Sequence, residues 1–478
     1  MPETSESSRR KGPAIGKSEI EKSEIGKSAI IRSATSQALM NLRAFAIVTV
    51  VSFHSVLAYL ASQPHATPPF ASPPFHWIST PILDSQRWPG FDIYAAFQYV
   101  SLMPVMFFLS GIFVWPSLKR KGSWNYLYAR ILRIGVPFLL GVYLLMPFAY
   151  YPVYRVGASD PSLLSYFKQL TALPFWPSGP LWFLWELLVF DCVAVAIFLS
   201  APRLIEGLGR LSTSASESAK RYFLLLLAVS AVAYLPLAFA FGTSNWGTWG
   251  PFALQSDRFL LYLVYFFAGV GVGVHGYDRG LLRPDGVLSR RWYIWAASAI
   301  GTFLLWMMSM APAVYGHSSV FLDTGAYLAV VLAVACACLG LAAVFPRFAR
   351  RRWAVTDSLA EHAYPIYLVH YVFVVWLQYA LLDITVPAIV KGVLVFTGAL
   401  MLSWSFAAGI GRLPWRAALV RVRAPTSGSC SAIPHRTPHE SRAKCGRPAE
   451  VAFTADGWNR NSTPCRRRRS RRHAASYR

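Results

Sequence analysis

The chain has 478 residues, of which 55% are hydrophobic and only 14% are charged. Soluble globular domains carry about 25% charged residues, so the composition excludes an ordinary soluble protein and indicates one that crosses a membrane several times. The formal net charge of +24 is also typical of nucleic-acid binding, but the basic residues gather between apolar runs, which favours a membrane topology.

The apolar runs predict the fold. Segments of roughly 20 residues, the length that crosses a bilayer core, recur ten times along the chain. We place these spans at 37–61, 93–116, 132–153, 180–200, 222–241, 258–275, 293–313, 323–346, 363–381 and 386–409. The predicted fold class is all-α, a polytopic membrane helix bundle with about ten transmembrane helices.

The connections between the spans alternate in charge. Basic residues gather before the first span and after the second, fourth, sixth and eighth spans. The alternate connections contain few of them, namely Arg87, Arg155, Lys168 and, at an edge, Arg258. Because cytoplasmic loops carry the excess of Lys and Arg, this alternation predicts that both termini are cytoplasmic.

Composition divides the chain into three regions. Residues 1–36 contain a polar near-repeat, IGKSEIEKSEIGKSAI, and are expected to form a disordered basic cytoplasmic leader. Residues 37–411 form the membrane domain, and residues 412–478, rich in Arg, Pro and Ser, are expected to form a disordered basic cytoplasmic tail. Within the membrane domain, the proline-rich connection 62–92 is expected to fold over the outer mouth of the bundle.

The first span, NLRAFAIVTVVSFHSVLAYL, carries Arg43 and His54. These residues are eleven positions apart, close to three helical turns, so both project from one face and lie about 16 Å apart along the axis. With the amino terminus inside, Arg43 lies near the cytoplasmic end and His54 beyond the midplane. An ionisable group at such depth is costly unless it faces a cavity or a partner, so we interpret both residues as functional.

Other spans add polar and small residues to the bundle. Ser110 and Gly111 in the second span allow the close approach of another helix. Arg130 and Arg133, three residues apart at the start of the third helix, outline an anion site. Lys391 in the last span is a further cation, and it lies close enough to the outer edge to extend its ammonium group to the interface.

Two more spans carry ionisable residues. Glu186 and Asp191 lie in the fourth span, and Tyr367 and His370 share one face of the ninth span near mid-membrane. Each residue alone has a structural explanation. Two histidines, two carboxylates and an arginine pair in one bundle are hard to explain by packing alone.

The order and spacing of five motifs resemble a known family. The motifs are R-x10-H in the first span, FFLSG in the second, an Arg-rich junction that leads to a proline, LWFL at the start of the fourth span, and YPIYLVH near the end. Over residues 38 to about 410, the chain resembles the acyltransferase 3 family of integral membrane acyltransferases. No second domain is expected after residue 410, so it is similar to the stand-alone ten-helix type, such as the glucan succinyltransferases. Where the family often has an acidic residue before the first motif, this chain has Met40 and Asn41.

The resemblance implies an acyltransferase that transfers groups other than aminoacyl groups. Such enzymes move an acetyl or succinyl group from cytoplasmic acyl-CoA, a substrate rather than a permanently bound cofactor, to a hydroxyl of an extracytoplasmic glycan or saccharide. Membrane lipid is a further expected partner, whereas nucleic acid and a metal ion are not expected. The implied location is a bacterial inner membrane.

The implied catalytic residues are His54, Glu186 and Asp191. His54 is expected to act as general base on the acceptor hydroxyl or to carry the acyl group covalently. Glu186 or Asp191 is expected to orient the imidazole. Donor binding is expected at three arginines, whose guanidinium groups suit phosphate geometry: Arg43, Arg130 and Arg133. Substrate contacts are expected at Trp182, Tyr367 and His370, although packing also explains the last two.

Two other function classes explain some of the same residues. In a secondary transporter or saccharide exporter, His54, Glu186 and Asp191 would form a proton relay. Transporters commonly contain two homologous halves, and the first span has no counterpart around spans five and six, which carry few ionisable residues. A non-catalytic scaffold or sensor would keep the fold without the reaction, and the presence of His54 argues against it.

Overall fold

The computed structural model describes residues 15–64, 69–243, 245–317 and 319–411. Most of the described elements are α-helices: α1 (Ile15–Val56), α2 (Pro89–Ile112), α3 (Val114–Lys121), α4 (Ser123–Arg130), α5 (Val136–Leu140), α6 (Met146–Gly157), α7 (Leu163–Ala172), α8 (Trp182–Ser200), α9 (Pro202–Glu217), α10 (Ala219–Phe241), α11 (Phe259–His275), α12 (Val287–Arg290), α13 (Trp292–Val314), α14 (Val320–Phe348), α15 (Ala354–Ala380) and α16 (Ala388–Gly411). Strands β1 (Trp246–Trp249) and β2 (Phe252–Gln255) form an antiparallel hairpin. Single 3-10 turns lie at Leu57–Tyr59, His76–Ile78 and Gly179–Leu181, and π-helical turns at Ile131–Gly135 and Gly141–Leu145.

The helices confirm the predicted all-α membrane bundle. In the described part of the chain, eight helical stretches are long and apolar enough to cross a bilayer, and they coincide with eight of the predicted spans. At the other two positions lie α11, which has 17 residues, and α15, which has 27. Helix α11 is short, and α15 contains more polar residues, among them Glu361, His370 and Gln378.

Helix α1 starts earlier than the sequence predicts. It begins at Ile15, so residues 15–36 are helical rather than part of a disordered leader. Once a span has nucleated a helix, each added residue contributes a backbone hydrogen bond, and the helix extends into a polar segment at low cost. The remainder of the predicted leader, 1–14, and the predicted tail, 412–478, lie outside the described residues.

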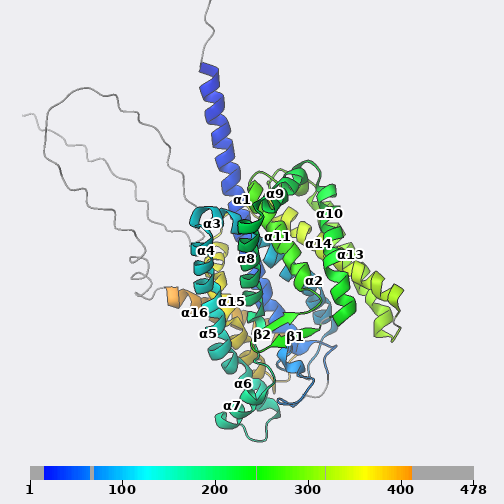
Figure 1. Cartoon of the computed structure of the whole chain (residues 1–478). Helices are drawn as coiled ribbons and strands as arrows, with labels where there is room; N and C mark the ends of the chain where they lie inside the picture. Colours follow the sequence, from blue (N-terminus) through cyan, green and yellow to red (C-terminus); the bar gives the residue numbers. More distant parts are fainter. Residues whose placement is uncertain (1–14, 65–68, 244, 318, 412–478) are drawn as a thin grey trace, which may run out of the picture. The chain divides into compact units, whose positions relative to one another are not determined.

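Figure 1 shows α3 and α9 at one end of the bundle and α6, α7 and the β-hairpin at the opposite end. The α3 and α9 end carries basic residues that the predicted topology assigns to the cytoplasm, including Lys119, Arg120 and Arg203. The two ends are therefore called the inner and the outer end.

Small residues bring α2 and α11 into backbone contact, as the sequence predicts at Gly111. A Cβ atom added to Gly111 would lie 2.0 Å from the carbonyl oxygen of Phe266, and one added to Gly269 would lie 2.0 Å from that of Phe108. Close approach through glycine is a common way to pack helices in lipid, where van der Waals contact replaces the hydrophobic drive.

Backbone hydrogen bonds hold the outer connection 62–88 against the end of α1. The backbone amides of Asp84 and Trp88 donate to the carbonyl oxygens of Ala58 and Tyr59. The Asp84 carboxylate pairs with Lys391 of α16 at 2.6 Å, and both side chains are fully buried. The prediction that Lys391 extends to the interface is therefore wrong, because Asp84 supplies a partner inside the protein.

Candidate active site

Helix α1 holds Arg43 and His54 on one continuous helix, as predicted. Arg43 is exposed between the buried residues Leu42 and Ala44, and His54 is half-buried. Arg43 lies in the inner part of the helix, while His54 lies two residues before the helix ends at Val56.

Helix α15 brings a second histidine against His54. The Nε2 atom of His370 lies 3.3 Å from Nδ1 of His54, and the ring centroids are 5.1 Å apart. His370 is fully buried. The rings of Tyr371 and His54 form a T-shaped pair, with centroids 5.3 Å apart and an interplanar angle of 83°. The sequence places His54 and His370 in separate spans and gives no indication that they meet.

The backbone partners of the two histidines assign their tautomers. Nδ1 of His54 lies 2.9 Å from the carbonyl oxygen of Val50, and Nδ1 of His370 lies 2.7 Å from that of Tyr367. A carbonyl oxygen only accepts hydrogen bonds, so both Nδ1 atoms carry the proton. Nε2 of His370 then accepts from His54, and Nε2 of His54 keeps a lone pair. This is the arrangement that a general base requires.

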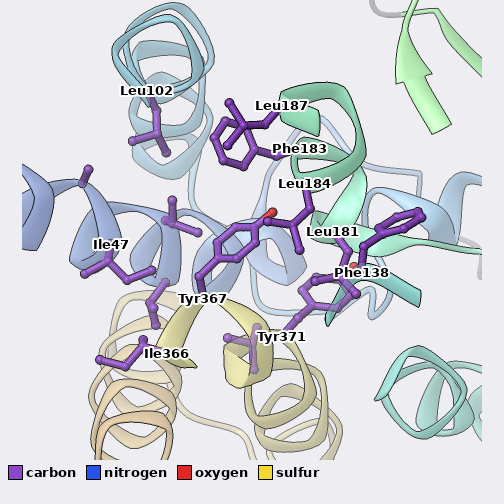
Figure 2. Close-up of a cluster of buried hydrophobic side chains, with 14 of the residues drawn as sticks. Ile47, Leu102, Phe138, Leu181, Phe183, Leu184, Leu187, Ile366, Tyr367 and Tyr371 are labelled. Carbon is purple, nitrogen blue, oxygen red and sulfur yellow. The ribbon is translucent and has the colours of Figure 1, made fainter. Parts of the chain in front are cut away.

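The tyrosines of α15 bind backbone groups of other elements. The Tyr364 hydroxyl donates to the carbonyl oxygen of Arg133 at 2.5 Å, and the Tyr367 hydroxyl donates to that of Pro180. Figure 2 shows the Tyr367 side chain within a cluster of buried apolar residues that includes Leu102 and Leu184. Tyr367 therefore positions the turn before α8, and its hydroxyl is already engaged.

The two carboxylates of α8 have different surroundings. Asp191 accepts a hydrogen bond of 2.5 Å from Tyr126 and lies 3.1 Å from Nε of Arg130. Glu186 is fully buried, and neither of its carboxylate oxygens has a hydrogen-bond partner among the described residues. Neither carboxylate forms a hydrogen bond with His54, so the expected orienting contact is not made.

The arginine pair lies where α4 passes into a π-helical turn. Arg130 is the last residue of α4, its side chain is 23% exposed, and it is shared between Asp191 and the Tyr126 hydroxyl, which lies 3.0 Å from Nε. Arg133 is half-buried within the turn Ile131–Gly135. Turns of this kind often occur at functional sites.

A family model described as an acyltransferase domain matches residues 37–408. The chain belongs to the acyltransferase 3 family. It is therefore an integral membrane acyltransferase. No curated protein and no solved structure matched the chain.

Other residues support the candidate site, and the sequence did not single them out. The Gln378 side chain donates to the carbonyl oxygens of His54 and Ser55 at 2.9 and 3.2 Å, and both carbonyls belong to the last turn of α1. Gln378 follows His370 by eight residues and thus lies on the same face of α15. A polar residue at that spacing is the signal in the sequence, and it identifies the contact only once the facing helix is known.

Asn41 has a structural role at the inner end of α1. Its side-chain amide donates to the carbonyl oxygens of Ala349 and Arg351 at 2.7 and 3.0 Å. A carboxylate at this position lacks the N–H groups for these bonds, so Asn41 suits the local geometry. The remaining predicted substrate residue, Trp182, packs on Trp246 of β1 and on Tyr262 of α11 and makes no hydrogen bond with the histidine pair.

Arg43 and Arg130 lie on different helices, and the Arg130 guanidinium is already engaged by Asp191 and Tyr126. In the described part of the chain, no three His, Cys, Asp or Glu residues gather in a way that would hold a metal ion.

Proposed function

We propose that this acyltransferase moves an acetyl or succinyl group from cytoplasmic acyl-CoA to a hydroxyl of an extracytoplasmic glycan, in a bacterial inner membrane. The observation that carries the proposal is the half-buried His54, whose Nε2 atom keeps a lone pair because Nδ1 faces the Val50 carbonyl. A neutral imidazole held in one tautomer is suited to accept a proton from a hydroxyl.

In the proposed reaction, Nε2 of His54 takes the proton from the acceptor hydroxyl as the oxygen attacks the thioester carbon. The new C–O bond forms, the C–S bond breaks, and the proton passes to the sulfur that leaves as the thiol of CoA. The alternative covalent route forms an acyl-imidazole on the same nitrogen. Both routes need Nε2 unprotonated at the start.

The donor is proposed to bind through its phosphates to Arg43, Arg130 and Arg133. Arg43 lies about 16 Å from His54 along α1, by the rise of an α-helix, and a long pantetheine arm separates the phosphates of CoA from its sulfur. Asp191 supports this site by holding Arg130 instead of orienting His54. Arginine is preferred for phosphate because its planar group donates two hydrogen bonds at once.

Glu186 is proposed to contact the acceptor. A buried carboxyl group without a hydrogen bond costs several kcal/mol, and both oxygens of Glu186 are in this condition. Donor hydroxyls of a saccharide are suitable partners. Trp182, half-buried beside Trp246, offers an aromatic surface for the same ligand.

The transporter alternative has less support. It requires a proton relay through His54, Glu186 and Asp191, but no hydrogen bond joins these three side chains in the described structure. The scaffold alternative is disfavoured by the tautomer of His54, which is that of a base.

The test is acyl transfer by the full-length protein in liposomes, with labelled acetyl- or succinyl-CoA on the inner side and a panel of glycans outside. We expect His54→Ala to lower transfer by about 10² to 10⁴, the usual contribution of a general base. His362→Ala is the matched control, because His362 also binds the carbonyl oxygen four residues before it but lies outside the proposed site. Activity of His54→Ala within a few-fold of wild type would exclude the base. Absence of labelled glycan with wild type would exclude the acceptor class.

A further inference from the structure

We propose that His370 is the positioning residue of His54 and takes the place that a carboxylate occupies in many catalytic triads. This inference rests on the proposed role of His54 as a base. It departs from the sequence-based expectation, in which Glu186 or Asp191 orients His54 and His370 contacts the substrate.

The geometry fixes the direction of each hydrogen bond in the pair. The Tyr367 carbonyl accepts from Nδ1 of His370 at 2.7 Å, which leaves Nε2 of His370 as an acceptor facing Nδ1 of His54 at 3.3 Å. The His54 proton at Nδ1 is therefore shared between His370 and the Val50 carbonyl, which is 2.9 Å away. The chain of bonds runs in one direction, from His54 through His370 to the backbone of α15.

His370 matters most after His54 has accepted a proton. The imidazolium then carries N–H groups at both nitrogens, and its Nδ1–H still points to the lone pair of His370. A hydrogen bond to a charged donor is stronger than one between neutral groups, so the contact stabilises the protonated form that appears during the reaction. His370 keeps its own proton at Nδ1 throughout. The proton taken up by His54 at Nε2 leaves with the sulfur of CoA, and the pair returns to its starting state.

Among the described residues, neither carboxylate of α8 competes for this position. Asp191 is bound to Tyr126 and Arg130, and Glu186 makes no hydrogen bond with a described residue. The aromatic rings of Phe53 and Tyr371 also pack against the His54 ring. His370 is also fully buried, so its ring is held by its surroundings and does not have to be ordered during the reaction.

Two substitutions of His370 separate positioning from packing. Glutamine places an amide oxygen near the position of Nε2 and keeps an acceptor, whereas leucine fills the space without one. If His370 positions the base, His370→Leu lowers kcat by about 10- to 100-fold, the loss of one hydrogen bond to a charged group, and His370→Gln recovers most of that loss. If His370 only packs, the order is reversed, because a buried glutamine is less well accommodated than leucine. The reversed order would overturn the inference.

The experiment uses the full chain in liposomes with labelled acyl-CoA and the glycan that accepts label from wild type. The KM for acyl-CoA is expected to stay within about two-fold in both variants, because the base acts after binding. Thermal unfolding in detergent shows whether each variant is folded, and His362→Leu is the matched control on the same helix.

A double variant distinguishes failure of this inference from failure of the proposed function. Because His370 acts through His54, His54→Ala with His370→Leu should be no slower than His54→Ala alone. If His54→Ala retains activity, the proposed base is wrong. If His54→Ala is inactive and His370→Leu retains activity, only the positioning role is wrong.

Discussion

Helices α1 and α15 pack by a different chemistry from α13 and α14. Between α1 and α15, side chains of His370 and Gln378 bind His54 and its carbonyl group, and Gln37 donates to Asp357 at 2.8 Å. The buried face of α14 is instead apolar and rich in small residues, among them Ala333, Ala337 and Gly340.

The lipid-facing side of α13 completes the contrast. Ile300, Leu304, Leu305 and Met308 are all more than half exposed, as suits a helix surrounded by apolar solvent. The comparison teaches that small residues are sufficient to hold two helices together in this bundle. Buried polar groups are costly in a membrane, and between α1 and α15 they form direct side-chain contacts that include His54 and His370. The following predictions test that division.

The largest effect on stability is expected at the buried ion pair next to α15. Lys391→Met leaves Asp84 charged and buried without its partner, which typically costs about 3–5 kcal/mol. The double variant Lys391→Met with Asp84→Leu should be less destabilised than Lys391→Met alone, since no charge is left unpaired. Unfolding in detergent, followed by circular dichroism, measures both. Equal losses in the two variants would show that the pair does not act as a unit.

The next effect is expected where α2 and α11 touch. Gly269→Ala forces a methyl group against the Phe108 carbonyl, only 2.0 Å from the ideal Cβ position. Overpacking of this kind typically costs about 1–3 kcal/mol. The midpoint of thermal unfolding in detergent should fall, and an unchanged midpoint would mean that the two backbones separate without cost.

A smaller effect is expected from Gln378→Leu. This change removes the donor that covers the last carbonyl groups of α1, and hydrogen bonds between membrane helices contribute about 0.6 kcal/mol on average. Activity is expected to fall by a few-fold, because the end of α1 that carries His54 loses its attachment to α15. Label transfer and unfolding of the same sample measure the two consequences, and a loss of stability without any loss of activity would contradict the link to His54.

The smallest effect is expected on α13. Gly301→Ala introduces a methyl group with no atom within 4 Å, and alanine is a better helix former than glycine by about 0.8–1.0 kcal/mol. Stability should therefore stay the same or rise slightly, and activity should not change. A clear destabilisation in unfolding experiments would show that α13 is packed against a partner on its exposed side.

Much of the fold follows from the sequence because apolar length and helical periodicity are local properties. The positions of the helices, the shared face of Arg43 and His54, and the close approach at Gly111 all come from one segment at a time. The sequence does not predict that α1 begins as early as Ile15, because the composition of a polar segment does not show that a helix propagates through it.

The site is harder to predict because it depends on which helices face each other. The sequence places Asp191 in the same span as Glu186 but does not show that Arg130 and Tyr126 lie opposite to it. For the same reason it gives no sign that His370 meets His54, or that Asp84 reaches Lys391. Each of these pairs joins residues that are far apart in the chain, and hydropathy carries no information about such pairing.

The contacts of α15 couple two distant parts of the site thermodynamically. Tyr364 binds the Arg133 carbonyl, and Gln378 binds the His54 carbonyl, so one helix contacts both places over a length of about 21 Å. A ligand that shifts α15 when it binds beside Arg133 must also change the free energy of the arrangement around His54. By linkage, binding at His54 alters affinity at the arginine end by the same factor. Ligand binding at the inner end and the position of the His54 imidazole are then coupled through the same conformational equilibrium of α15.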